Sequence, residues 1–574
     1  MTSPNPPIIR RIEDLDRCDA LCRKTNCTEL DPPEIEACKE CPKPVWFTAF
    51  FDGTGNSFYR DDGKHEGKDR NKYLGPKRDD GAQGEITDGM PDEKNTYYSN
   101  IAKLAKFAHE PDNDADGKKK VRSRYIPGVG APCMYDGVND GGGFFEHKLG
   151  MGMAYKGEAR IRWMLRELRE YVDNQVHFVS RVNLAVFGFS RGATQARAFV
   201  RMLVTEKLAE EVSGKLYWRG QNMNKERPEV VIYFMGLFDT VASVGYGGGG
   251  LETWARNLSV VAGRLHWGGF LVSGALWAID KGGHAEWAKD ISIPGYVRQC
   301  VHYVACHEVR EKFPSDSVRV GQEIPSNCVE VFYPGTHCDV GGSYKHEEQE
   351  KRLNTLANIA LNNMFIDAWN AGVPLKCPND VMKQAGSQFE ILPELEQHWN
   401  DYMGQGGAGD GDRAPDSDEL KENIIWHMDR YYKWRIDRFR RLNTSGDPLH
   451  KNKENKKDKD NIDDYMKITD KEWEEDISRI KWENQNRGKL KPHENVILEA
   501  YLALWRDAWP SRTQSLLRGF FDTYVHDSIA SFKDLMMSEQ AGIAENSRWA
   551  INRVYFMGND FPPWYYGIDE DQKQ

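Results

Sequence analysis

Residues 182–194 read Val-Asn-Leu-Ala-Val-Phe-Gly-Phe-Ser-Arg-Gly-Ala-Thr, and this stretch decides the fold. Its first half is apolar and partly β-branched, which predicts a buried strand, and residues 195–203 predict a helix. Between them stands Gly-x-Ser-x-Gly, the pattern of a nucleophile elbow, in which a sharp turn exposes a serine at a strand end. Glycines are needed at 188 and 192 because so tight a turn has no room for β-carbons. The stretch therefore predicts Ser190 as a nucleophile, since a chance match would lack the flanking strand and helix.

The composition is that of a large globular chain. Its 574 residues are 39% hydrophobic and 29% charged, with a net charge of −11. A chain of this length can bury a large core and is expected to form more than one domain. The acidic balance argues against a general nucleic-acid-binding protein, because phosphate contacts require clustered Lys and Arg. A local basic face stays open as an alternative.

The sequence shows neither a secretory signal nor a membrane-spanning stretch. Residues 1–7 lack the basic-then-apolar pattern of a signal peptide. The most apolar stretch, residues 267–279, is too short to span a bilayer. We therefore expect a protein made in the cytoplasm without a signal peptide, which would leave the cell only by a route that reads no cleaved signal.

Cysteines are numerous and unevenly placed. Of the eleven, five lie near the start of the chain: Cys18, Cys22, Cys27, Cys38 and Cys41. Their spacing suits two short helices joined by disulfides, or a zinc site; the lack of a histidine among them favours disulfides, and free thiols are a third alternative. The other six are predicted to be mostly buried small apolar side chains: Cys133, Cys300, Cys306, Cys328, Cys338 and Cys377.

A second predicted strand ends in a glycine-rich turn. Residues 45–51 are apolar, and Asp-Gly-Thr-Gly-Asn follows them. Glycines let backbone N–H groups converge, so Thr54 and Gly55 are predicted to supply one half of an oxyanion hole and the Arg191 N–H the other. A competing interpretation is a phosphatase motif with two aspartates flanking one residue, but Phe50 occupies the position of the first aspartate.

Two further strand ends carry the expected partners of the serine. Asp239 follows the apolar stretch 230–238, where the acid of a hydrolase triad belongs. His337 lies in a glycine-rich loop after the predicted strand 328–333. The order Ser, Asp, His is that of the α/β-hydrolases. We therefore predict that His337 takes the proton of Ser190 and that Asp239 orients the imidazole.

Alternatives stay open for these residues. Asp239 could serve only to cap its own turn. His337 could be a core histidine, in which case His302 or His526 would be the substitute base. No cofactor and no metal are predicted, since aspartates beside glycines, Asp52 and Asp339, are weak evidence for a cation that needs several more ligands.

We expect three regions. A cysteine-rich segment spans residues 1–43, a catalytic domain spans 44–370, and a mostly helical region for partner or membrane binding spans 371–574. Within the catalytic domain, the glycine-hinged apolar insertion 245–295 is predicted to be either a lid that contacts membranes or a core helix pair. The fold class is α/β: an α/β-hydrolase with a mostly parallel central sheet, large insertions and a largely helical C-terminal region.

Four motifs together resemble one family, the first class of type VI secretion lipase effectors of bacteria, built on an uncharacterised α/β-hydrolase domain. The matching stretches are Phe-Phe-Asp-Gly-Thr-Gly-Asn at 50–56, Gly-Phe-Ser-Arg-Gly-Ala at 188–193, Gly-Leu-Phe-Asp-Thr-Val at 236–241 and Gly-Thr-His-Cys-Asp-Val-Gly-Gly at 335–342. One departure is Cys338, where most relatives are expected to carry serine; it leaves His337 in place.

The resemblance implies an antibacterial phospholipase A. It also implies delivery by the type VI spike protein into the periplasm of a target cell, and a cognate immunity protein that protects the producer. Two other functions stay open: a soluble carboxylesterase or acyltransferase with the same triad, and a non-catalytic binding protein on a hydrolase fold. A rate that rises at a lipid surface would favour the lipase over the esterase, and a broken triad would favour the binding protein.

Overall fold

The computed structural model describes most of the chain, in segments. These are residues 5–15, 43–58, 98–109, 120–140, 150–175, 179–220, 227–242, 286–310, 313–404, 413–444, 462–488, 490, 492–505, 511–530, 553–558 and 564–565. The five N-terminal cysteines lie outside the described residues, as does the predicted apolar insertion up to residue 285. The prediction of a lid or a core helix pair there is therefore untested.

A twisted sheet forms the centre of the catalytic region. Among the described residues its path runs β11 (Cys328–Tyr333), β9 (Cys300–Ala305), β8 (Glu229–Phe238), β5 (Val179–Phe189), β1 (Lys43–Phe51) and β2 (Val121–Ile126). All neighbours along this path are parallel. Because the carboxyl ends of parallel strands meet at one edge, the residues that follow β5, β8 and β11 come together there.

A small hairpin extends this sheet. It consists of β6 (Ala209–Val212) and β7 (Lys215–Trp218), and β7 pairs antiparallel with the beginning of β8. Its two turn residues, Ser213 and Gly214, have φ values of 51° and 78°. Two consecutive residues with positive φ suit a tight hairpin turn, whose twist matches that of the strands.

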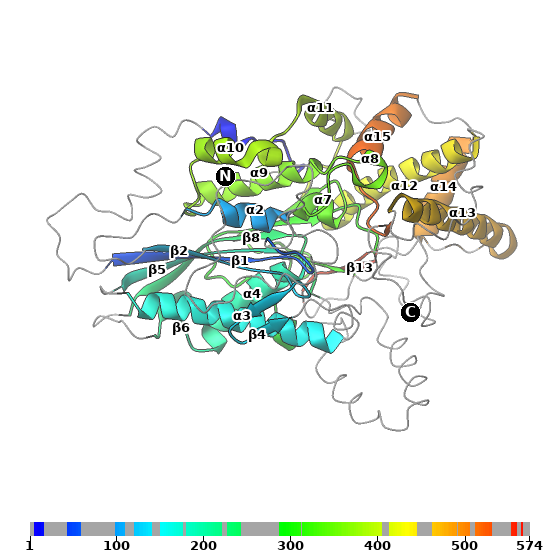
Figure 1. The fold of residues 1–574 in the computed structure, drawn as a ribbon. Helices are drawn as coiled ribbons and strands as arrows, with labels where there is room; N and C mark the ends of the chain where they lie inside the picture. Colours follow the sequence, from blue (N-terminus) through cyan, green and yellow to red (C-terminus); the bar gives the residue numbers. More distant parts are fainter. Residues whose placement is uncertain are drawn as a thin grey trace.

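Helices cover both faces of the sheet (Figure 1). One face carries α3 (Gly150–Asp173) and α4 (Arg191–Thr205), and the other carries α2 (Asn100–Lys106) and α9 (Leu356–Asn370). In β1, Phe47 and Phe51 pack into the core on the α3 and α4 side, whereas Phe50 packs into the core on the other side. Because both faces are buried, the strands read as continuous apolar runs in the sequence. The predicted fold class is confirmed.

The C-terminal region is largely helical, as predicted. Its helices are α10 (Pro378–Ala385), α11 (Pro393–Tyr402), α12 (Leu420–Thr444), α13 (Ile462–Arg487), α14 (Pro492–Trp505) and α15 (Ser511–Tyr524). Near the end of the described chain, β12 (Val554–Phe556) pairs with β13 (Trp564–Tyr565) and with β10 (Ser315–Asp316) of the catalytic region. This pairing brings the C-terminal part of the chain back to the carboxyl edge of the central sheet.

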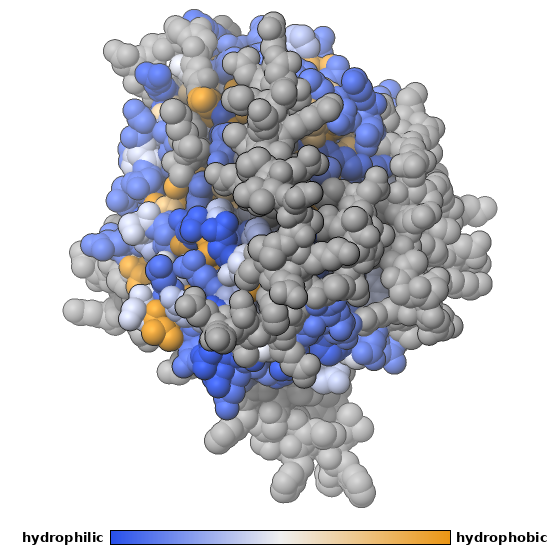
Figure 2. Space-filling model, turned by 90° about the vertical axis from the view of Figure 1, so that its left-hand side faces the viewer, coloured by the Kyte–Doolittle hydropathy of each residue, from blue (hydrophilic) through white to orange (hydrophobic). Residues whose placement is uncertain are grey.

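Exposed apolar side chains among the described residues are scattered. On the face that Figure 2 shows, hydrophobic residues form small separate spots among mostly hydrophilic ones. The large exposed apolar side chains are Ile8, Tyr155, Val212, Val320, Leu392, Ile425, Trp482 and Leu502. Within the described part of the chain, no helix is both long and apolar enough to cross a bilayer.

The scattered cysteines are mostly buried, with one correction. Cys133, Cys300, Cys306 and Cys328 are free and buried, as predicted, and Cys338 is free and half-buried. Cys377 is disulfide-bonded, so the prediction of a buried apolar thiol was wrong there. It is half-buried at the start of α10 instead of lying in a core, which leaves its sulfur accessible to a second cysteine.

Candidate active site

Ser190 joins β5 to α4 in a conformation that few non-glycine residues adopt. Its φ is 57° and its ψ is −127°. Such a conformation costs on the order of 1–3 kcal/mol and persists only where the surrounding structure enforces it. The Ser190 N–H donates to the Phe238 carbonyl oxygen at 3.0 Å, and the Val241 N–H donates to the Ser190 carbonyl oxygen at 3.2 Å. The loop after β8 therefore holds the strained turn in place.

Both glycines of the turn are required for steric reasons, as predicted. A β-carbon on Gly188 would lie 2.5 Å from the Cα of Ala193. One on Gly192 would lie 2.3 Å from the backbone oxygens of Phe51 and Asp52. Real β-carbons essentially never come within 3.0 Å of another atom, and these neighbours are backbone that cannot swing aside. The predicted sharp turn between strand and helix is confirmed as a local structure.

The Ser190 hydroxyl is buried and makes no hydrogen bond to any described residue. Leaving a hydroxyl in this state costs about 1–3 kcal/mol. Such a group in a native structure calls for an explanation, and a catalytic role is one. The N-terminus of α4 begins at the next residue, so its dipole favours negative charge that develops near the serine.

His337 and Asp239 meet directly. His337 begins α7 (His337–Gly341) just after β11, and its Nδ1 lies 2.5 Å from Oδ2 of Asp239. Its ring packs against Phe189, the residue before the serine, at 4.6 Å between ring centroids, and against Phe313 at 5.1 Å. The structure thus brings the predicted base to the predicted acid, beside the elbow.

Asp239 is held by more donors than the sequence indicates. It is buried, with φ of 41°, and its Oδ1 accepts from the Ala305 N–H at 3.0 Å. Arg553, 314 residues away in the chain, donates to Oδ1 at 2.8 Å and to Oδ2 at 2.7 Å. Our sequence interpretation missed Arg553, whose only local signal is a short apolar stretch after it.

These contacts set the charges of the pair. Burial tends to raise the pKa of Asp239, but Arg553 and His337 outweigh it and hold that pKa well below its usual range. Burial lowers the pKa of His337 below 6.5, against the opposing effect of Asp239, and nearby guanidinium groups lower it further. At neutral pH the carboxylate is therefore ionised and the imidazole neutral, as a general base requires.

The two alternative histidines serve other contacts. His302 Nε2 accepts from the Thr240 N–H at 3.0 Å, and its Nδ1 lies 2.9 Å from Oε2 of Glu330. His526 Nδ1 lies 2.7 Å from Oδ1 of Asp339. Among the described contacts, neither histidine is bonded to the acid at the end of β8, so both support loops next to the site.

One predicted oxyanion donor is excluded. The Gly55 N–H donates to the Val129 carbonyl oxygen at 2.9 Å, so it is already used within the fold. The cause is a close approach of two backbones: a β-carbon on Gly128 would lie 1.6 Å from the Gly53 oxygen. The other two predicted residues do lie together, since Arg191 Nη1 donates to Thr54 Oγ1 at 3.1 Å.

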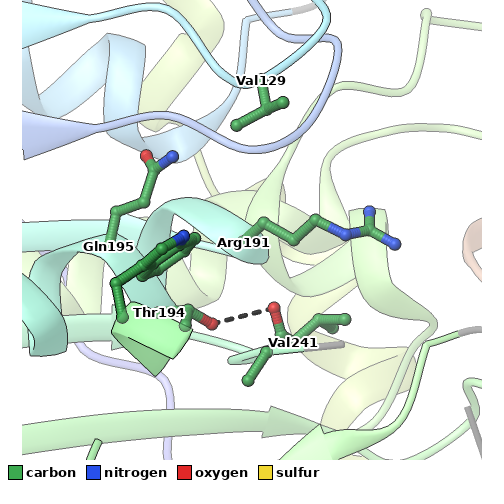
Figure 3. A pocket seen from close by; sticks show the side chains of 7 residues that line it. Val129, Arg191, Thr194, Gln195 and Val241 are labelled. Carbon is green, nitrogen blue, oxygen red and sulfur yellow. Dashed lines mark hydrogen bonds between the residues drawn. The ribbon is translucent and has the colours of Figure 1, made fainter. Parts of the chain in front are cut away.

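A small cavity lies beside the elbow (Figure 3). It has a volume of about 10 Å³ and is lined by Val129, Arg191, Thr194, Gln195, Val241, Ala242 and Trp287. A space of this size holds about one water molecule and no acyl chain. The Thr194 hydroxyl donates to the Val241 carbonyl oxygen at 2.8 Å, which adds a second link between the elbow helix and the loop after β8 (Figure 3).

The two aspartates that could have bound a cation are engaged by the protein. Asp52 accepts hydrogen bonds from side chains. Ser99 Oγ donates to it at 2.6 Å, and the Tyr125 hydroxyl donates to it at 2.5 Å. Asp339 accepts from the backbone and hydroxyl of Thr336, both at 2.9 Å, as the capping partner of α7. Among the described residues, no group of three or more His, Cys, Asp or Glu could hold a metal ion.

A buried histidine holds the loop that precedes His337. The Gly335 N–H donates to His307 Nδ1 at 2.9 Å, so this nitrogen must stay unprotonated. Nε2 of the same ring lies 3.0 Å from the Tyr402 hydroxyl. Burial lowers the pKa of His307 to about 3.

Acid is expected to destabilise the protein through His307. Its pKa is lower in the folded state than in the unfolded state, so its contribution is complete above about pH 6.5 and is lost as the pH falls toward about 3. The free energy of unfolding should fall by up to about 1.4 kcal/mol per pH unit for this one group. Urea unfolding of the native protein and of His307→Gln measures this; the variant should show the smaller slope against pH, and equal slopes would contradict the assignment.

Comparisons with known proteins agree with this geometry. Residues 49–213 and 204–367 match the family model described as "T6SS, Phospholipase effector Tle1-like, catalytic domain". The fold is similar to that of an uncharacterized protein from Pseudomonas aeruginosa, with a TM-score of 0.53 and 20% identity over 90% of this chain and 80% of that chain. No curated protein has significant sequence similarity to the chain.

A second solved structure is more distant. It is a Tle1 effector bound to the VgrG spike of the type VI secretion system, with a TM-score of 0.38 and 17% identity over 68% of this chain and 84% of that chain. The match to the family model runs from residue 49 to residue 367, which is more than half of the 574 residues. The chain therefore belongs to the Tle1-like phospholipase effectors of the type VI secretion system, and the parallel sheet and sharp turn of its catalytic region are those of an α/β-hydrolase fold.

Proposed function

We propose that this effector is a phospholipase A that hydrolyses acyl esters of membrane glycerophospholipids through a Ser190–His337–Asp239 triad. The observation that carries the proposal is the strained elbow, where Ser190 holds a buried hydroxyl with no partner among the described residues. The contact between His337 and Asp239 next to this elbow supports it. The family supplies the substrate class.

We propose the following reaction for these groups. Nε2 of His337 takes the proton of Ser190 as Oγ attacks the ester carbonyl carbon, and Asp239 stabilises the imidazolium that forms. The backbone N–H groups of Arg191 and Thr54 are proposed to stabilise the oxyanion. The imidazolium returns the proton to the leaving lysophospholipid oxygen. Water, deprotonated by the same imidazole, then hydrolyses the acyl-serine and releases the fatty acid.

Delivery is proposed by analogy within the family. The Tle1 effector of the spike complex is bound to VgrG, and we propose that a spike protein of this kind carries the present effector into the periplasm of a target cell. A cognate immunity protein would protect the producing cell. Binding to purified spike protein, measured by size-exclusion chromatography, tests the first partner independently of catalysis.

The enzymatic proposal is tested with vesicles of phosphatidylethanolamine and phosphatidylglycerol. Chains labelled at the sn-1 or the sn-2 position show which ester is cut. The mass of the peptide that contains Ser190 shows whether an acyl-serine forms when the reaction is quenched early. We expect fatty acid release and an acylated Ser190 peptide. Turnover of a soluble short-chain ester without any release from vesicles would favour the esterase instead.

Activity should persist into mildly acidic solution. Because the pKa of His337 lies below 6.5, the base stays mostly neutral there, and kcat/KM should change by no more than about twofold between about pH 7 and about pH 6.5. The measurement uses a soluble ester, so that the surface charge of vesicles does not distort the local pH. An acidic limb centred near pH 7 or above would contradict the assignment.

A further inference from the structure

The Arg553 guanidinium is held by hydrogen bonds from all three of its nitrogens, next to the proposed triad. It precedes β12, and its side chain is buried. Nε donates to the Phe313 carbonyl oxygen at 2.6 Å, and Nη1 donates to the Ala305 carbonyl oxygen at 3.1 Å. The two remaining bonds go to the two carboxylate oxygens of Asp239. A planar guanidinium with this many fixed donors can hold a carboxylate in only one orientation.

We propose that Arg553 is a positioning residue for the triad, which holds the Asp239 carboxylate in place for His337. The inference rests on the proposed function and extends it to a residue outside the region that the family model matches, which ends at residue 367. Of the four bonds that Asp239 accepts, Arg553 supplies two, the Ala305 N–H supplies one and His337 supplies one. Without Arg553 the carboxylate could rotate about its side-chain bonds and leave the imidazole.

Other C-terminal residues support the same loops. His526, just after α15, bonds to Asp339 through its ring at 2.7 Å and through its backbone N–H at 3.1 Å. Ser528 donates to Glu308 at 3.0 Å, and Glu308 in turn accepts from the His337 N–H at 3.3 Å. Three residues beyond position 500 thus hold the carboxylate, the turn and the backbone around the proposed base.

The charge of Arg553 has a consequence of its own. It partly neutralises Asp239, and so reduces the attraction that would otherwise favour a protonated imidazole. Among the described residues, the other charged or titratable groups around His337 are Glu308 and Arg310 after β9, Arg191 across the Phe313 ring, Cys338 next in sequence, and Asp339 on the same turn with its partner His526 after α15. All of these residues stay in the variants, so a shift of the pH profile would follow from the loss of the Arg553 charge, which acts on Asp239, His337 and Glu308.

The test compares two replacements of Arg553 with a matched control. Arg553→Gln removes the charge and the fork of donors, whereas Arg553→Lys keeps the charge but cannot bind both oxygens in the same way. Arg438→Gln is the control, because Arg438 is also buried and binds two carboxylates outside the proposed triad, Asp470 in α13 and Glu350. For each protein we would measure kcat and KM on a soluble ester against pH, together with Tm.

Arg553→Gln should lower kcat by about 10- to 100-fold, with KM changed less, because the base loses its orientation. The acidic limb of its kcat–pH profile should move up by about one pH unit. Without the Arg553 charge, the Asp239 carboxylate attracts the protonated imidazole of His337 more strongly. Arg553→Lys should lower kcat without moving the limb, and Arg438→Gln should lower only Tm. A native pH profile and kcat in Arg553→Gln would overturn the proposal, as would a native kcat in Arg553→Lys if the glutamine variant does not fold.

A second readout separates this proposal from the proposed function. The ring protons of His337, assigned by comparison with His337→Gln, can be titrated by NMR without any substrate. The titration should move to higher pH in Arg553→Gln and stay in place in Arg438→Gln. If the native protein cleaves no ester, the phospholipase proposal fails, and this titration still decides whether Arg553 governs the Asp239–His337 pair. An unmoved titration would overturn that role.

Discussion

Ser190→Ala is expected to slow fatty acid release by about 10⁵-fold, because the members of a triad act as one unit. The residual rate would come from substrate binding and the oxyanion donors. Stability should be unchanged or slightly higher. The replacement removes a buried hydroxyl that has no described partner and leaves the strained backbone as it is. Fatty acid release from phospholipid vesicles and Tm from thermal unfolding measure the two effects.

Ser315→Ala is the matched control for this experiment. Ser315 in β10 is also buried, and its hydroxyl likewise has no partner among the described residues. Loss of that hydroxyl should leave the rate within about twofold of native, since it bonds to no described residue and so positions no reacting group. If Ser190→Ala retained a tenth or more of the native rate, the nucleophile would be another residue and the triad assignment would fail.

Gly192→Ala should have the second-largest effect. It should lower both the free energy of unfolding and the rate of turnover. The new β-carbon would lie 2.3 Å from the backbone oxygens of Phe51 and Asp52, so the elbow and the end of β1 must separate. We expect a loss of about 3 kcal/mol or more in the free energy of unfolding, as for other severe steric changes in a core. The same movement displaces Ser190 from the donors on the β1 turn, which should slow turnover by about 100-fold or more.

Gly295→Ala provides the comparison for this variant. A β-carbon there would meet nothing within 4 Å. Its free energy of unfolding should therefore stay within about 0.5 kcal/mol of native. Urea unfolding of both variants measures the free energy of unfolding, and hydrolysis of vesicles measures the turnover. A stable and active Gly192→Ala would contradict this prediction, because the backbone around the elbow would then have moved to accept the new β-carbon.

The local parts of the site could be predicted because they depend on residues close together in sequence. The elbow needs glycines at two fixed offsets from one serine, and a strand before and a helix after it, all within residues 182–205. The predicted strands 45–51, 230–238 and 328–333 correspond to β1, β8 and β11. Since parallel strands share one carboxyl edge, the residues at three strand ends could be expected to converge before their contacts were known.

Other contacts depended on packing between segments far apart in the chain. No sequence rule indicates that the Gly55 N–H donates to the Val129 carbonyl oxygen, because that bond forms where two loops distant in sequence pack against each other. Nor does any short motif place Cys377 in a disulfide or His526 on Asp339. The division into regions at residues 43 and 370 stays a prediction, although residues well beyond 370 bind Asp239 and Asp339.

The sequence by itself thus determined the fold class, the elbow and the strand ends that carry Ser190, Asp239 and His337, because each follows from local chemistry and from the geometry of a parallel sheet. Only the tertiary structure decided which groups surround them. Arg553 reaches Asp239 across 314 positions of chain, and its place is fixed by the pairing of β12 with β10. Such a contact has no local pattern, since its stabilisation comes from burial and charge pairing that exist only once the chain has folded.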